Sequence, residues 1–369
     1  MPQPDPISPA RLDDVRALFP YVQDRVYLDT AAAGLTWKGH GEAVARFFDE
    51  VKCRGFDARP EWLAMTERVR ARLAAWLGVA PADITLVSNT TEGLNLAALS
   101  LRFEPGDRVV LAADEFPSVD RVWDAAERAG ACIVRVDIPS EDARQAALMQ
   151  AVDGRTRVLA VSHTHWSTGT TVDLDALGRH CRQHGTLLMV DGMQALGAVP
   201  TRLDGVNIYA ASFFKWMLSG FGIGVLVTSQ QARERMTPAY RGYANADDAH
   251  RLQYAHVNMP AIYGLDATLD TLEAIGWDWI HARVAQLGGH LVDAADRLGL
   301  PLITPRSQHA GVWAVRAGDA EAARARLSER GFSVSARGAG VRISPHFYNT
   351  EEDVRRGVQA LAEVLGHRG

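Results

Sequence analysis

An aspartate and a lysine follow two successive apolar runs of the chain and could form a catalytic pair. Residues 187–191 (LLMVD) end on Asp191, and residues 207–213 (NIYAASF) come shortly before Lys215. Each run has the length and the β-rich composition of a buried strand. Because parallel strands present their ligand sites at their carboxyl ends, we expect the Asp191 carboxylate and the Lys215 amine to lie side by side.

Lysine is rare in this chain, which makes its place in an apolar stretch informative. Of the 39 basic residues only Lys38, Lys52 and Lys215 are lysines, so 36 are arginines. An amine can form an imine with an aldehyde, whereas a guanidinium in practice does not. The alternative interpretation of Lys215 is a surface lysine that extends its amine to solvent, and its aromatic neighbours Phe214 and Trp216 disfavour that alternative.

A neighbouring carboxylate and amine suit pyridoxal phosphate. The lysine would hold the aldehyde as an imine (a Schiff base), and the carboxylate would keep the pyridine nitrogen protonated, so that the ring draws electrons from a substrate's α-carbon. At an effective dielectric of about 20, a charge pair near 4 Å contributes roughly 4 kcal/mol, or about three pKa units. The alternative for Asp191 is a cap of the following turn.

The phosphate of this cofactor needs an anion site, and residues 88–95 (SNTTEGLN) offer one directly after the apolar run 84–88. Hydroxyl and free amide groups at the start of a helix bind phosphate. Ser212, three residues before Lys215, could add another hydroxyl. The alternative is ordinary helix capping by serine and threonine.

Residues 220–224 (GFGIG) have a superficial likeness to a dinucleotide-binding loop. The motif is one residue short of G-x-G-x-x-G and leads into the β-rich run 223–228 instead of opening a helix. We therefore expect a tight turn after Lys215 and no nicotinamide site.

The composition excludes several other classes of protein. With 369 residues, 47% of them hydrophobic, the chain can form a large and a small domain. A net charge of −5 offers no cationic surface for nucleic acid. Cys53, Cys132 and Cys181 show no C-x-x-C spacing, so we expect neither disulfides nor a metal site. Because we find no apolar run of about 18 residues and no signal peptide, we expect a cytoplasmic protein away from membranes.

Short β-rich runs alternate with helical stretches through the middle of the chain. Several of these runs are apolar nearly throughout, as strands covered on both faces are. The alternation predicts an α/β fold with a mainly parallel sheet of about seven strands. The expected strands are residues 84–88, 109–112, 133–136, 158–163, 187–191, 207–213 and 223–228.

The pattern changes after residue 260. Two long helices are expected over 261–275 and 277–298, and a small α+β domain follows them. We divide the chain into an N-terminal segment (1–30), a large α/β domain (31–259) and the linking helices with the small C-terminal domain (260–369). Within the small domain we expect strands at 312–315, near Val334 and at 341–344, and helices over 319–330 and from Thr350.

Three short motifs together resemble those of one known group of enzymes. They are residues 27–32 (YLDTAA), 89–92 (NTTE) and 191–194 (DGMQ). With Lys215 they make the chain similar, over nearly its whole length, to the class V aminotransferase group of fold-type I pyridoxal-phosphate enzymes. That group includes cysteine desulfurases, kynureninase-like enzymes and isopenicillin N epimerase-like proteins. The resemblance implies the fold of the PLP-dependent transferases of type I.

The resemblance also implies roles for individual residues. Residues 341–350 (VRISPHFYNT) are similar to the segment whose arginine binds the substrate α-carboxylate, which would be Arg342. Asp191 would contact the pyridine nitrogen, and Lys215 would hold the imine. Gln194 would contact the ring hydroxyl, and the phosphate would be bound by Thr90, Thr91 and Ser212.

The chain departs from the group's pattern at positions where its members differ in reaction. Phe116 stands where desulfurases carry a histidine stacked on the cofactor. A phenyl ring can stack but cannot transfer a proton, which leaves that work to Lys215 or to His163 and His165. Each of these histidines could equally be structural. Trp166 stands where an asparagine often lies near the ring.

Two further departures concern the partner subunit and the sulfur chemistry. His256, in residues 254–258 (YAHVN), replaces a threonine that in relatives reaches the partner's phosphate, and Asn258 ends the same segment. We still expect a homodimer, in which partner loops and residues 37–62 complete the side-chain pocket. Because no cysteine lies between Lys215 and Arg342, a desulfurase that forms a persulfide is disfavoured.

These observations favour an enzyme that acts at the α-carbon of an amino acid, with Lys215 moving the proton, as an aminotransferase or an epimerase. Transamination is the first choice. A β-eliminating carbon–sulfur lyase is the alternative, because it needs no accepting cysteine. A catalytically silent pyridoxal-phosphate-binding protein is the alternative outside the enzymes.

Overall fold

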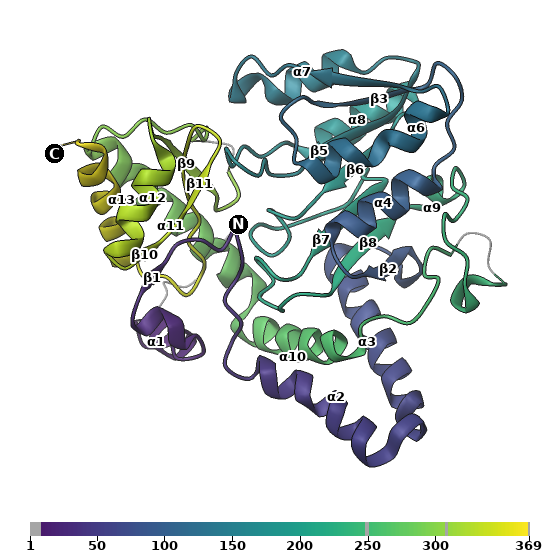
Figure 1. The fold of residues 1–369 in the computed structure, drawn as a ribbon, viewed down its shortest axis with the longest axis horizontal. Helices are drawn as coiled ribbons and strands as arrows, with labels where there is room; N and C mark the ends of the chain where they lie inside the picture. The colour runs from purple at the N-terminus through teal and green to yellow at the C-terminus, as the bar shows by residue number, and fades with distance from the viewer. Residues whose placement is uncertain (1–8, 248–250, 307–308, 368–369) are drawn as a thin grey trace.

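A seven-stranded sheet forms the centre of the larger of two domains (Figure 1). The structure is a computed structural model and describes residues 9–247, 251–306 and 309–367. The order across the sheet is β2-β8-β7-β6-β5-β3-β4. Its strands are β2 (Ile84–Val87), β3 (Arg108–Ala112), β4 (Cys132–Val136), β5 (Thr156–Ser162), β6 (Leu187–Asp191), β7 (Ile208–Ser212) and β8 (Gly224–Thr228).

The sheet is parallel except at one strand. Strands β4, β3, β5, β6 and β7 run in the same direction, whereas β8 is antiparallel to both β7 and β2. The predicted α/β fold is confirmed, and each of the seven expected strands is present with bounds that differ by at most two residues. The register places Ser162 of β5 opposite Asp191 of β6, so the carboxyl ends of these strands meet at one edge.

Both faces of the sheet are buried, which explains the nearly continuous apolar runs. In β6, Leu188 and Val190 belong to one core cluster, whereas Leu187 and Met189 belong to the cluster on the opposite face. This alternation is the period of two that a strand requires. One cluster includes residues of the helices Arg59–Leu77, Arg144–Ala151 and Leu174–His184, and the other includes residues of the helices Thr90–Ser100 and Asp124–Arg128.

Ten helices precede or surround the sheet in the described part of the chain. They are α1 (Pro9–Arg16), α2 (His40–Arg54), α3 (Arg59–Leu77), α4 (Thr90–Ser100), α5 (Pro117–Asp120), α6 (Asp124–Arg128), α7 (Arg144–Ala151), α8 (Leu174–His184), α9 (Gln230–Arg233) and α10 (Met259–Ile275). Within the described ranges, no helix combines the length and the apolar character that a bilayer span requires.

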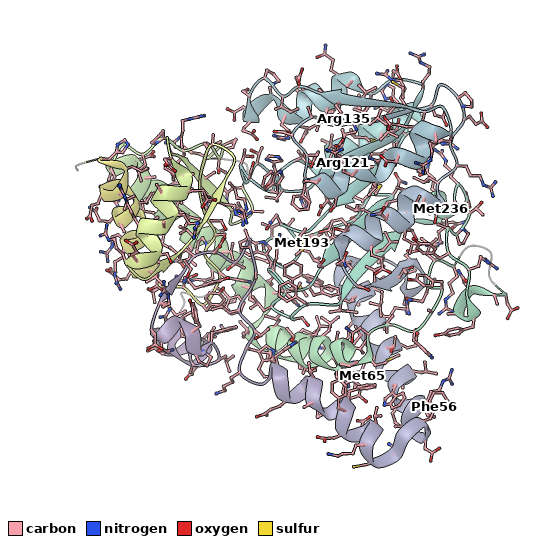
Figure 2. The ribbon with its side chains drawn as sticks, viewed as in Figure 1. Phe56, Met65, Arg121, Arg135, Met193 and Met236 are labelled. Atoms are coloured by element: carbon pink, nitrogen blue, oxygen red, sulfur yellow. The ribbon has the colours of Figure 1, made fainter. Side chains whose placement is uncertain are left out.

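Helices α2 and α3 project away from the sheet as a long hairpin (Figure 1). Residues 37–62 were expected to be loops at the pocket, but most of them belong to these two helices, and none lines the cavity of the same chain described below. Their contribution to a partner's pocket stays a prediction. Figure 2 shows Phe56 at the far end of the hairpin, where its side chain is 70% exposed.

The small domain has its own antiparallel sheet and core. The sheet has the order β11-β12-β9, and β1 pairs with β10 beside it. The strand expected near Val334 is present as two short strands on either side of it. The elements are β1 (Val26–Tyr27), α11 (Trp277–Arg297), β9 (Trp313–Arg316), α12 (Ala320–Glu329), β10 (Phe332–Ser333), β11 (Ser335–Arg337), β12 (Gly340–Ile343) and α13 (Glu351–Leu365).

The chain passes between the two cores near Gly276. Helix α10 packs in the larger core through Ile262 and Leu265, whereas α11 contributes Leu287 to the smaller one. Gly276 ends α10 with a φ of 96°, a value that favours glycine. Leu28 also lies in the smaller core, beside β1. The domain limits predicted at residues 30 and 259 stay a proposal, and residues 1–8 of the N-terminal segment lie outside the described residues.

Candidate active site

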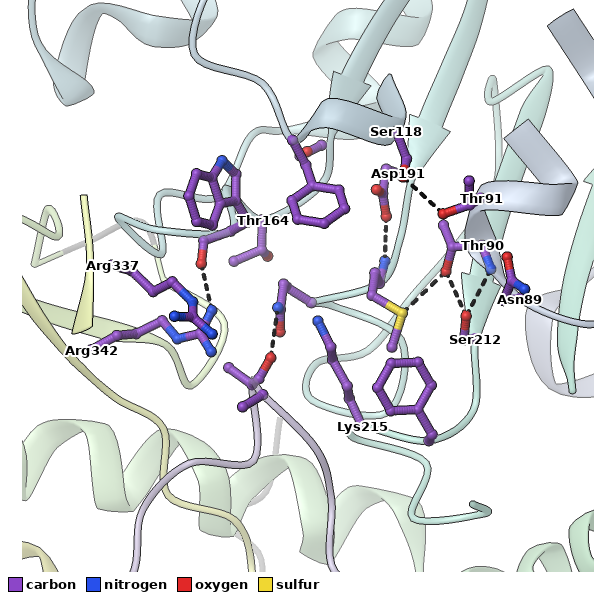
Figure 3. Close-up of a pocket in the computed structure, with 18 of the residues that line it drawn as sticks. Asn89, Thr90, Thr91, Ser118, Thr164, Asp191, Ser212, Lys215, Arg337 and Arg342 are labelled. Carbon is purple, nitrogen blue, oxygen red and sulfur yellow. Dashed lines mark hydrogen bonds between the residues drawn. The ribbon is translucent and has the colours of Figure 1, made fainter. Parts of the chain in front are cut away.

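A cavity of about 610 Å³ lies where the carboxyl ends of β5, β6 and β7 face the small domain (Figure 3). Both domains contribute to its wall, with Asp191 and Lys215 from the large one and Arg342 from the small one. The structure therefore brings together most of the residues that the sequence predicted. The predicted residues that line the cavity are Thr90, Thr91, Phe116, Trp166, Asp191, Gln194, Ser212, Lys215 and Arg342.

Lys215 points into this cavity from the turn after β7 (Figure 3). Its Nζ lies 5.7 Å from the centre of the Phe214 ring. Burial lowers the pKa of Lys215 to about 8, and the neighbouring Arg342 cation acts in the same direction. An amine with this pKa is partly unprotonated near neutral pH, and the unprotonated form is the one that attacks an aldehyde or takes a proton.

The turn around Lys215 has an unusual backbone. Leu218 has a φ of 55°, a left-handed value that costs energy for a residue with a side chain. Gly220 and Gly222 also have positive φ values, 71° and 90°, and lead the chain back into β8. A Cβ added at Gly34 would lie 1.9 Å from the carbonyl oxygen of Lys215. Position 34, in the segment before α2, can therefore approach this turn so closely only because it is a glycine. The expected tight turn is thus confirmed.

Asp191 ends β6 with its carboxylate directed at the cavity (Figure 3). The side chain is 6% exposed, and its Oδ1 accepts a hydrogen bond from the Met193 backbone N–H at 2.8 Å. Burial raises the pKa of Asp191 to about 6, while the hydrogen bond and the Lys215 cation oppose that rise. The carboxylate is therefore mostly ionised at neutral pH, and its other oxygen takes no hydrogen bond from the described residues, as a partner of a protonated ring nitrogen requires.

The start of α4 gathers hydroxyl groups at the cavity wall. The Asn89 side chain caps this helix by accepting the Glu92 backbone N–H at 2.9 Å. The Thr90 backbone N–H donates to Ser212 Oγ at 2.7 Å, and the Thr90 and Ser212 hydroxyls lie 2.8 Å apart. The Thr91 hydroxyl lies 2.8 Å from that of Ser118. Hydroxyls grouped at the positive end of an eleven-residue helix suit a phosphate.

Gln194 lies at the cavity wall and forms a hydrogen bond to the motif of residues 27–32. Its Nε2 donates to the Ala31 carbonyl at 3.0 Å, and its Oε1 accepts the Trp216 indole N–H at 3.0 Å. These bonds hold the amide in one orientation at the cavity wall and leave its second N–H without a partner among the described residues. A contact from Gln194 to the ring hydroxyl stays a prediction.

Arg342 lies on β12 with its guanidinium at the cavity wall. The residue is 2% exposed, its Nη1 donates to the Trp166 carbonyl at 2.7 Å, and its Nη2 lies 3.6 Å from Oδ1 of Asp29. Burial lowers the pKa of Arg342 to about 10, which leaves it charged at neutral pH. A buried guanidinium with one weak ion pair is a suitable site for a carboxylate.

Two aromatic rings form another part of the wall. Phe116 and Trp166 meet edge to face, with ring centres 5.8 Å apart and planes at 69°. The indole N–H of Trp166 donates to the Asp114 carbonyl at 3.2 Å, which fixes its ring. Both rings contribute apolar surface to the cavity, and stacking of Phe116 on a pyridine ring stays a prediction.

The two histidines considered as proton carriers do not line the cavity. Ser162, Thr164 and Trp166 line it, and His163 and His165, which alternate with them, are buried elsewhere. Burial lowers the pKa of His163 to about 4, so this ring is neutral near pH 7. This geometry supports the alternative interpretation, in which both histidines are structural and do not carry protons.

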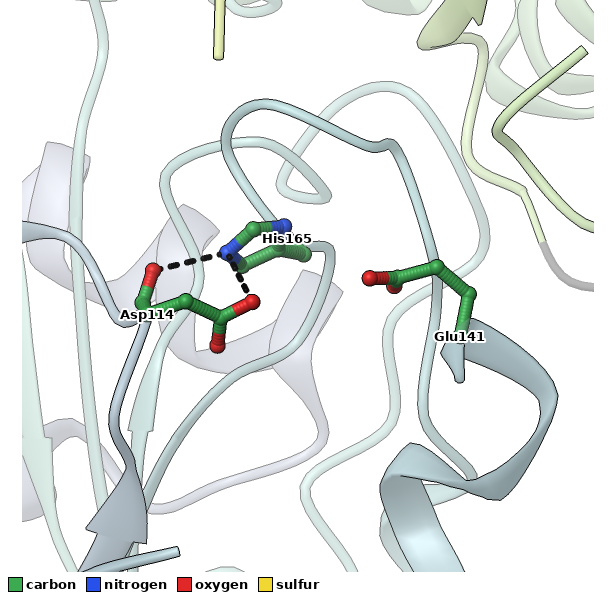
Figure 4. A group of neighbouring side chains, drawn as sticks. All are labelled: Asp114, Glu141 and His165. Atoms are coloured by element: carbon green, nitrogen blue, oxygen red, sulfur yellow. Dashed lines mark hydrogen bonds and ion pairs between the residues drawn. The ribbon is translucent and has the colours of Figure 1, made fainter. Parts of the chain in front are cut away.

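His165 belongs to a polar cluster with Asp114 and Glu141 (Figure 4). The ligand atoms of these three residues lie within 4.8 Å of one another, a spacing that could hold a metal ion. The guanidinium of buried Arg144 already contacts both carboxylates, Asp114 at 2.6 Å and Glu141 at 3.0 Å. The cluster is therefore an ion-pair network behind the cavity, and its positive charge comes from Arg144.

His256 and Asn258 lie outside the cavity. They border a separate small depression with Tyr254. The His256 backbone N–H donates to the Tyr243 hydroxyl, and the Asn258 side chain caps α10 by accepting the Ala261 N–H. Their contribution to a partner's site stays a prediction.

Several lining residues were missed at the sequence level. Ser162 and Thr164 could have been found as polar residues at the end of a buried strand. Ser118 and Arg337 gave no such signal, because serine is common in turns and arginine is common throughout this chain.

Comparisons with known proteins agree with this geometry. The sequence pattern of the family described as aminotransferase class-V matches residues 26–356. The chain is 25% identical over 371 residues to an uncharacterized aminotransferase of Bacillus subtilis, covering 96% of this chain and 99% of that protein. It is 28% identical over 381 residues to isopenicillin N epimerase of Streptomyces clavuligerus, covering 92% and 95%.

A solved structure shares the fold. It is that of a protein named C-DES with glycine covalently linked to its pyridoxal-phosphate cofactor. The TM-score is 0.87 at 21% identity, and the alignment covers 94% of this chain and 99% of that one. The likeness extends over both domains, since the aligned part is nearly the whole of each chain.

Proposed function

The chain belongs to the aminotransferase class-V family, and we propose that it transfers the amino group of an amino acid, with Lys215 as its acid–base group. Pyridoxal phosphate is the cofactor. When bound, it supplies an aldehyde that takes up the substrate's amino group and a ring that draws electrons from the α-carbon. The observation that supports the proposal best is one cavity lined by Lys215, Asp191 and the start of α4.

Each charged part of the cofactor has a matching group in the cavity. The ionised carboxylate of Asp191 can hold a protonated ring nitrogen. The hydroxyls of Thr90, Thr91 and Ser212, at the positive end of α4, can hold the phosphate. Arg342 can hold the substrate's α-carboxylate through its guanidinium. Lys215 can then move a proton at the substrate's α-carbon, because burial keeps its pKa near neutral, at about 8.

The number of acid–base groups favours transamination over epimerisation. Inverting the configuration at the α-carbon is most direct with a proton carrier on each side of it. Among the described residues that line the cavity, Lys215 is the only amine, and the lining set contains no histidine, cysteine or tyrosine. His163 and His165 are buried away from the cavity. A single amine could take the α-proton and deliver a proton, on the same side, to the carbon that carried the cofactor's aldehyde, which is the transfer that amino transfer needs.

We further propose a cytoplasmic homodimer with a small-molecule substrate and no nucleic-acid or membrane partner. Support for a partner comes from Phe221, which is 71% exposed and stacks at 4.3 Å on Phe214 at the edge of the cavity. Phe56, at the end of the α2–α3 hairpin, is a second exposed ring. Phe56 contacts Trp62, which contacts Phe47 and through it the exposed Phe48, so these rings form one apolar patch, a feature that often marks an interface.

An amino-acid screen with the cofactor-loaded protein tests the proposed reaction. Each amino acid is incubated with and without an added 2-oxo acid as the amino-group acceptor. Three products are measured: the new amino acid formed from the acceptor, the opposite enantiomer of the substrate, and ammonia released when no acceptor is added. Formation of the new amino acid supports transamination. The enantiomer would indicate an epimerase, and ammonia with a 2-oxo acid would indicate the β-eliminating lyase.

A lysine variant provides the control. Lys215→Ala should lose turnover by a factor of at least about 10³, since both the covalent anchor and the proton carrier are removed. Full turnover in this variant would disprove the assignment. Bound cofactor without a spectral change for any amino acid would favour the catalytically silent protein.

A further inference from the structure

A second arginine, Arg337, lies beside Arg342 on one face of a β-hairpin. The register of β11 and β12 pairs Ser335 with Arg342 and Arg337 with Gly340. Paired residues of antiparallel strands share a face, and so do residues two apart, so both arginines project from the same face. Diagonal neighbours of this kind are about 7–8 Å apart, within reach of long side chains. Figure 3 shows the two guanidiniums side by side at the cavity wall.

The two arginines differ in their partners. Arg342 is buried and contacts the Trp166 carbonyl and the Asp29 carboxylate. Asp29 also accepts the Ser335 hydroxyl at 2.8 and 2.7 Å, so its carboxylate is already engaged. The guanidinium of Arg337 makes one hydrogen bond, to the neighbouring Ala336 carbonyl at 2.8 Å. No carboxylate of the described residues lies within 4.0 Å of it.

The hairpin is held in place beside the cavity. Its turn residue Gly338 has a φ of 52°, and a Cβ there would lie 3.7 Å from the Ser167 hydroxyl. The turn therefore packs against the segment that carries Trp166. This contact fixes the backbone from which Arg337 projects, while its side chain stays exposed at the mouth of the cavity.

One charged residue at the cavity wall has no partner in the proposed function. The charged lining residues are Asp191, Lys215, Arg337 and Arg342. In the proposed function, Asp191 holds the cationic ring, the start of α4 holds the phosphate, and Arg342 holds the α-carboxylate. Arg337 then remains as a cation that faces the substrate without a partner, next to another guanidinium that repels it.

We propose that the substrate is an amino acid with a second anionic group, a carboxylate or a sulfinate, in its side chain, and that Arg337 binds this group. The inference rests on the proposed function, because it takes Arg342 for the α-carboxylate. A guanidinium pairs with either oxyanion through two parallel hydrogen bonds.

Matched pairs of substrates test this inference in the cofactor-loaded protein. L-Aspartate is compared with L-asparagine, and L-glutamate with L-glutamine, since each pair differs in charge but hardly in size. L-Cysteine sulfinate tests the sulfinate. We expect kcat/KM to be at least about tenfold higher for the acid of one pair. Preference for sulfinate over both dicarboxylic acids would identify the sulfinate as the ligand.

Substitutions then assign the preference to Arg337. Arg337→Gln should reduce the acid-to-amide ratio of kcat/KM to near one, and Arg337→Lys should retain part of it. Arg326→Gln is the control, because Arg326 is exposed on α12 of the same domain and does not line the cavity. An unchanged ratio in Arg337→Gln, or an equal loss for acids and amides, would overturn the inference. An equal loss would mean that both arginines bind the α-carboxylate.

A binding measurement separates this inference from the proposed function. Calorimetry with the cofactor-loaded protein compares glutarate, which has two carboxylates, with butyrate, which has one. We expect glutarate to bind at least about tenfold more tightly, and this advantage to disappear in Arg337→Gln. If no amino acid is turned over but glutarate keeps its Arg337-dependent advantage, the proposed reaction fails and the anion site stands. If amino acids are turned over without either effect, only the anion site fails.

Discussion

Replacing Lys215 with methionine should stabilise the cofactor-free protein. Burial lowers the pKa of this lysine from 10.5 to about 8, so its charged form is disfavoured in the folded state. The shift corresponds to about 3 kcal/mol at about 1.4 kcal/mol per unit. Methionine has a similar length and no charge to desolvate. The free energy of unfolding should therefore rise by up to about 3 kcal/mol. The gain is reduced by the stabilisation of the ionised Asp191 carboxylate that the Lys215 cation provides and that methionine removes.

The sign of the effect depends on pH. Below about pH 8 the amine is charged in both the folded and the unfolded chain, so the full cost of burial opposes folding. Between about pH 8 and 10.5 the unfolded chain binds the proton and the folded chain does not, so the wild-type protein gains stability from this group as the pH rises. The advantage of the methionine variant should therefore be largest below pH 8 and should vanish as the pH approaches 10.5.

Urea unfolding of both proteins after cofactor removal, at about pH 6.5, 8 and 9.5, measures this difference. Lys52→Met is the matched control, because Lys52 is exposed on α2 and forms an ion pair with Asp49 at 2.8 Å. That substitution should not stabilise the protein. Equal stability of the wild type and Lys215→Met at about pH 6.5, or a gain that does not change with pH, would refute the conclusion that burial sets the pKa of Lys215.

Three further substitutions test the remaining contacts of the site. Asp191→Asn should lower kcat by about 10² to 10³ while the cofactor stays bound, since about three pKa units of ring protonation are lost, and a loss below about tenfold in steady-state assays would contradict this role. Ser212→Ala removes the hydroxyl that contacts Thr90 and should weaken binding of pyridoxal phosphate about tenfold, as measured by fluorescence titration. Equal weakening of the binding of pyridoxal, which has no phosphate, would exclude a contact between Ser212 and the phosphate. Arg342→Gln should raise KM about 10 to 100-fold for amino acids, but not for amines without a carboxylate.

The large sheet could be predicted because its signals are local. Leu187 to Val190 alternate between two buried faces, so the whole run is apolar and is recognisable in the sequence. The carboxyl ends of such strands meet at one edge, which is why Asp191 and Lys215 could be paired from the order of residues alone.

The α2–α3 hairpin could not be predicted in the same way. Its contacts with the rest of the domain join residues far apart in the chain: Phe47 packs on Tyr263 of α10 at 5.7 Å, and the Tyr263 hydroxyl donates to Glu50. Val44, Phe47, Phe48 and Val51 of α2 recur at i, i+3, i+4 and i+7, so the sequence carries the apolar stripe of a helix, although only Ala43 is fully buried. What this stripe packs against depends on tertiary contacts, which periodicity in the sequence does not reveal.

The site was predictable to the extent that each role needs a rare or patterned residue. One lysine among many arginines and a run of small hydroxyl residues after a strand are distinctive, whereas Arg337 is one of 36 arginines. Its proximity to Arg342 depends on the register of a hairpin. His163 and His165 were considered because they are close in sequence to the site, but strand-like alternation turns them away from the cavity that Ser162 and Thr164 line.

The scarcity of lysine and the burial of Lys215 together explain how an aldehyde cofactor would select this residue. At pH 7 an amine with a pKa of about 8 is unprotonated about 10% of the time, about 300-fold more often than one at 10.5. The other two lysines, Lys38 and Lys52, are exposed and do not line the cavity. Arginine elsewhere keeps the positive charge that the surface needs without offering a competing amine. Burial that costs folding stability therefore gives the site its reactive nitrogen, which is why the stability and the chemistry of Lys215 should change together when its surroundings are altered.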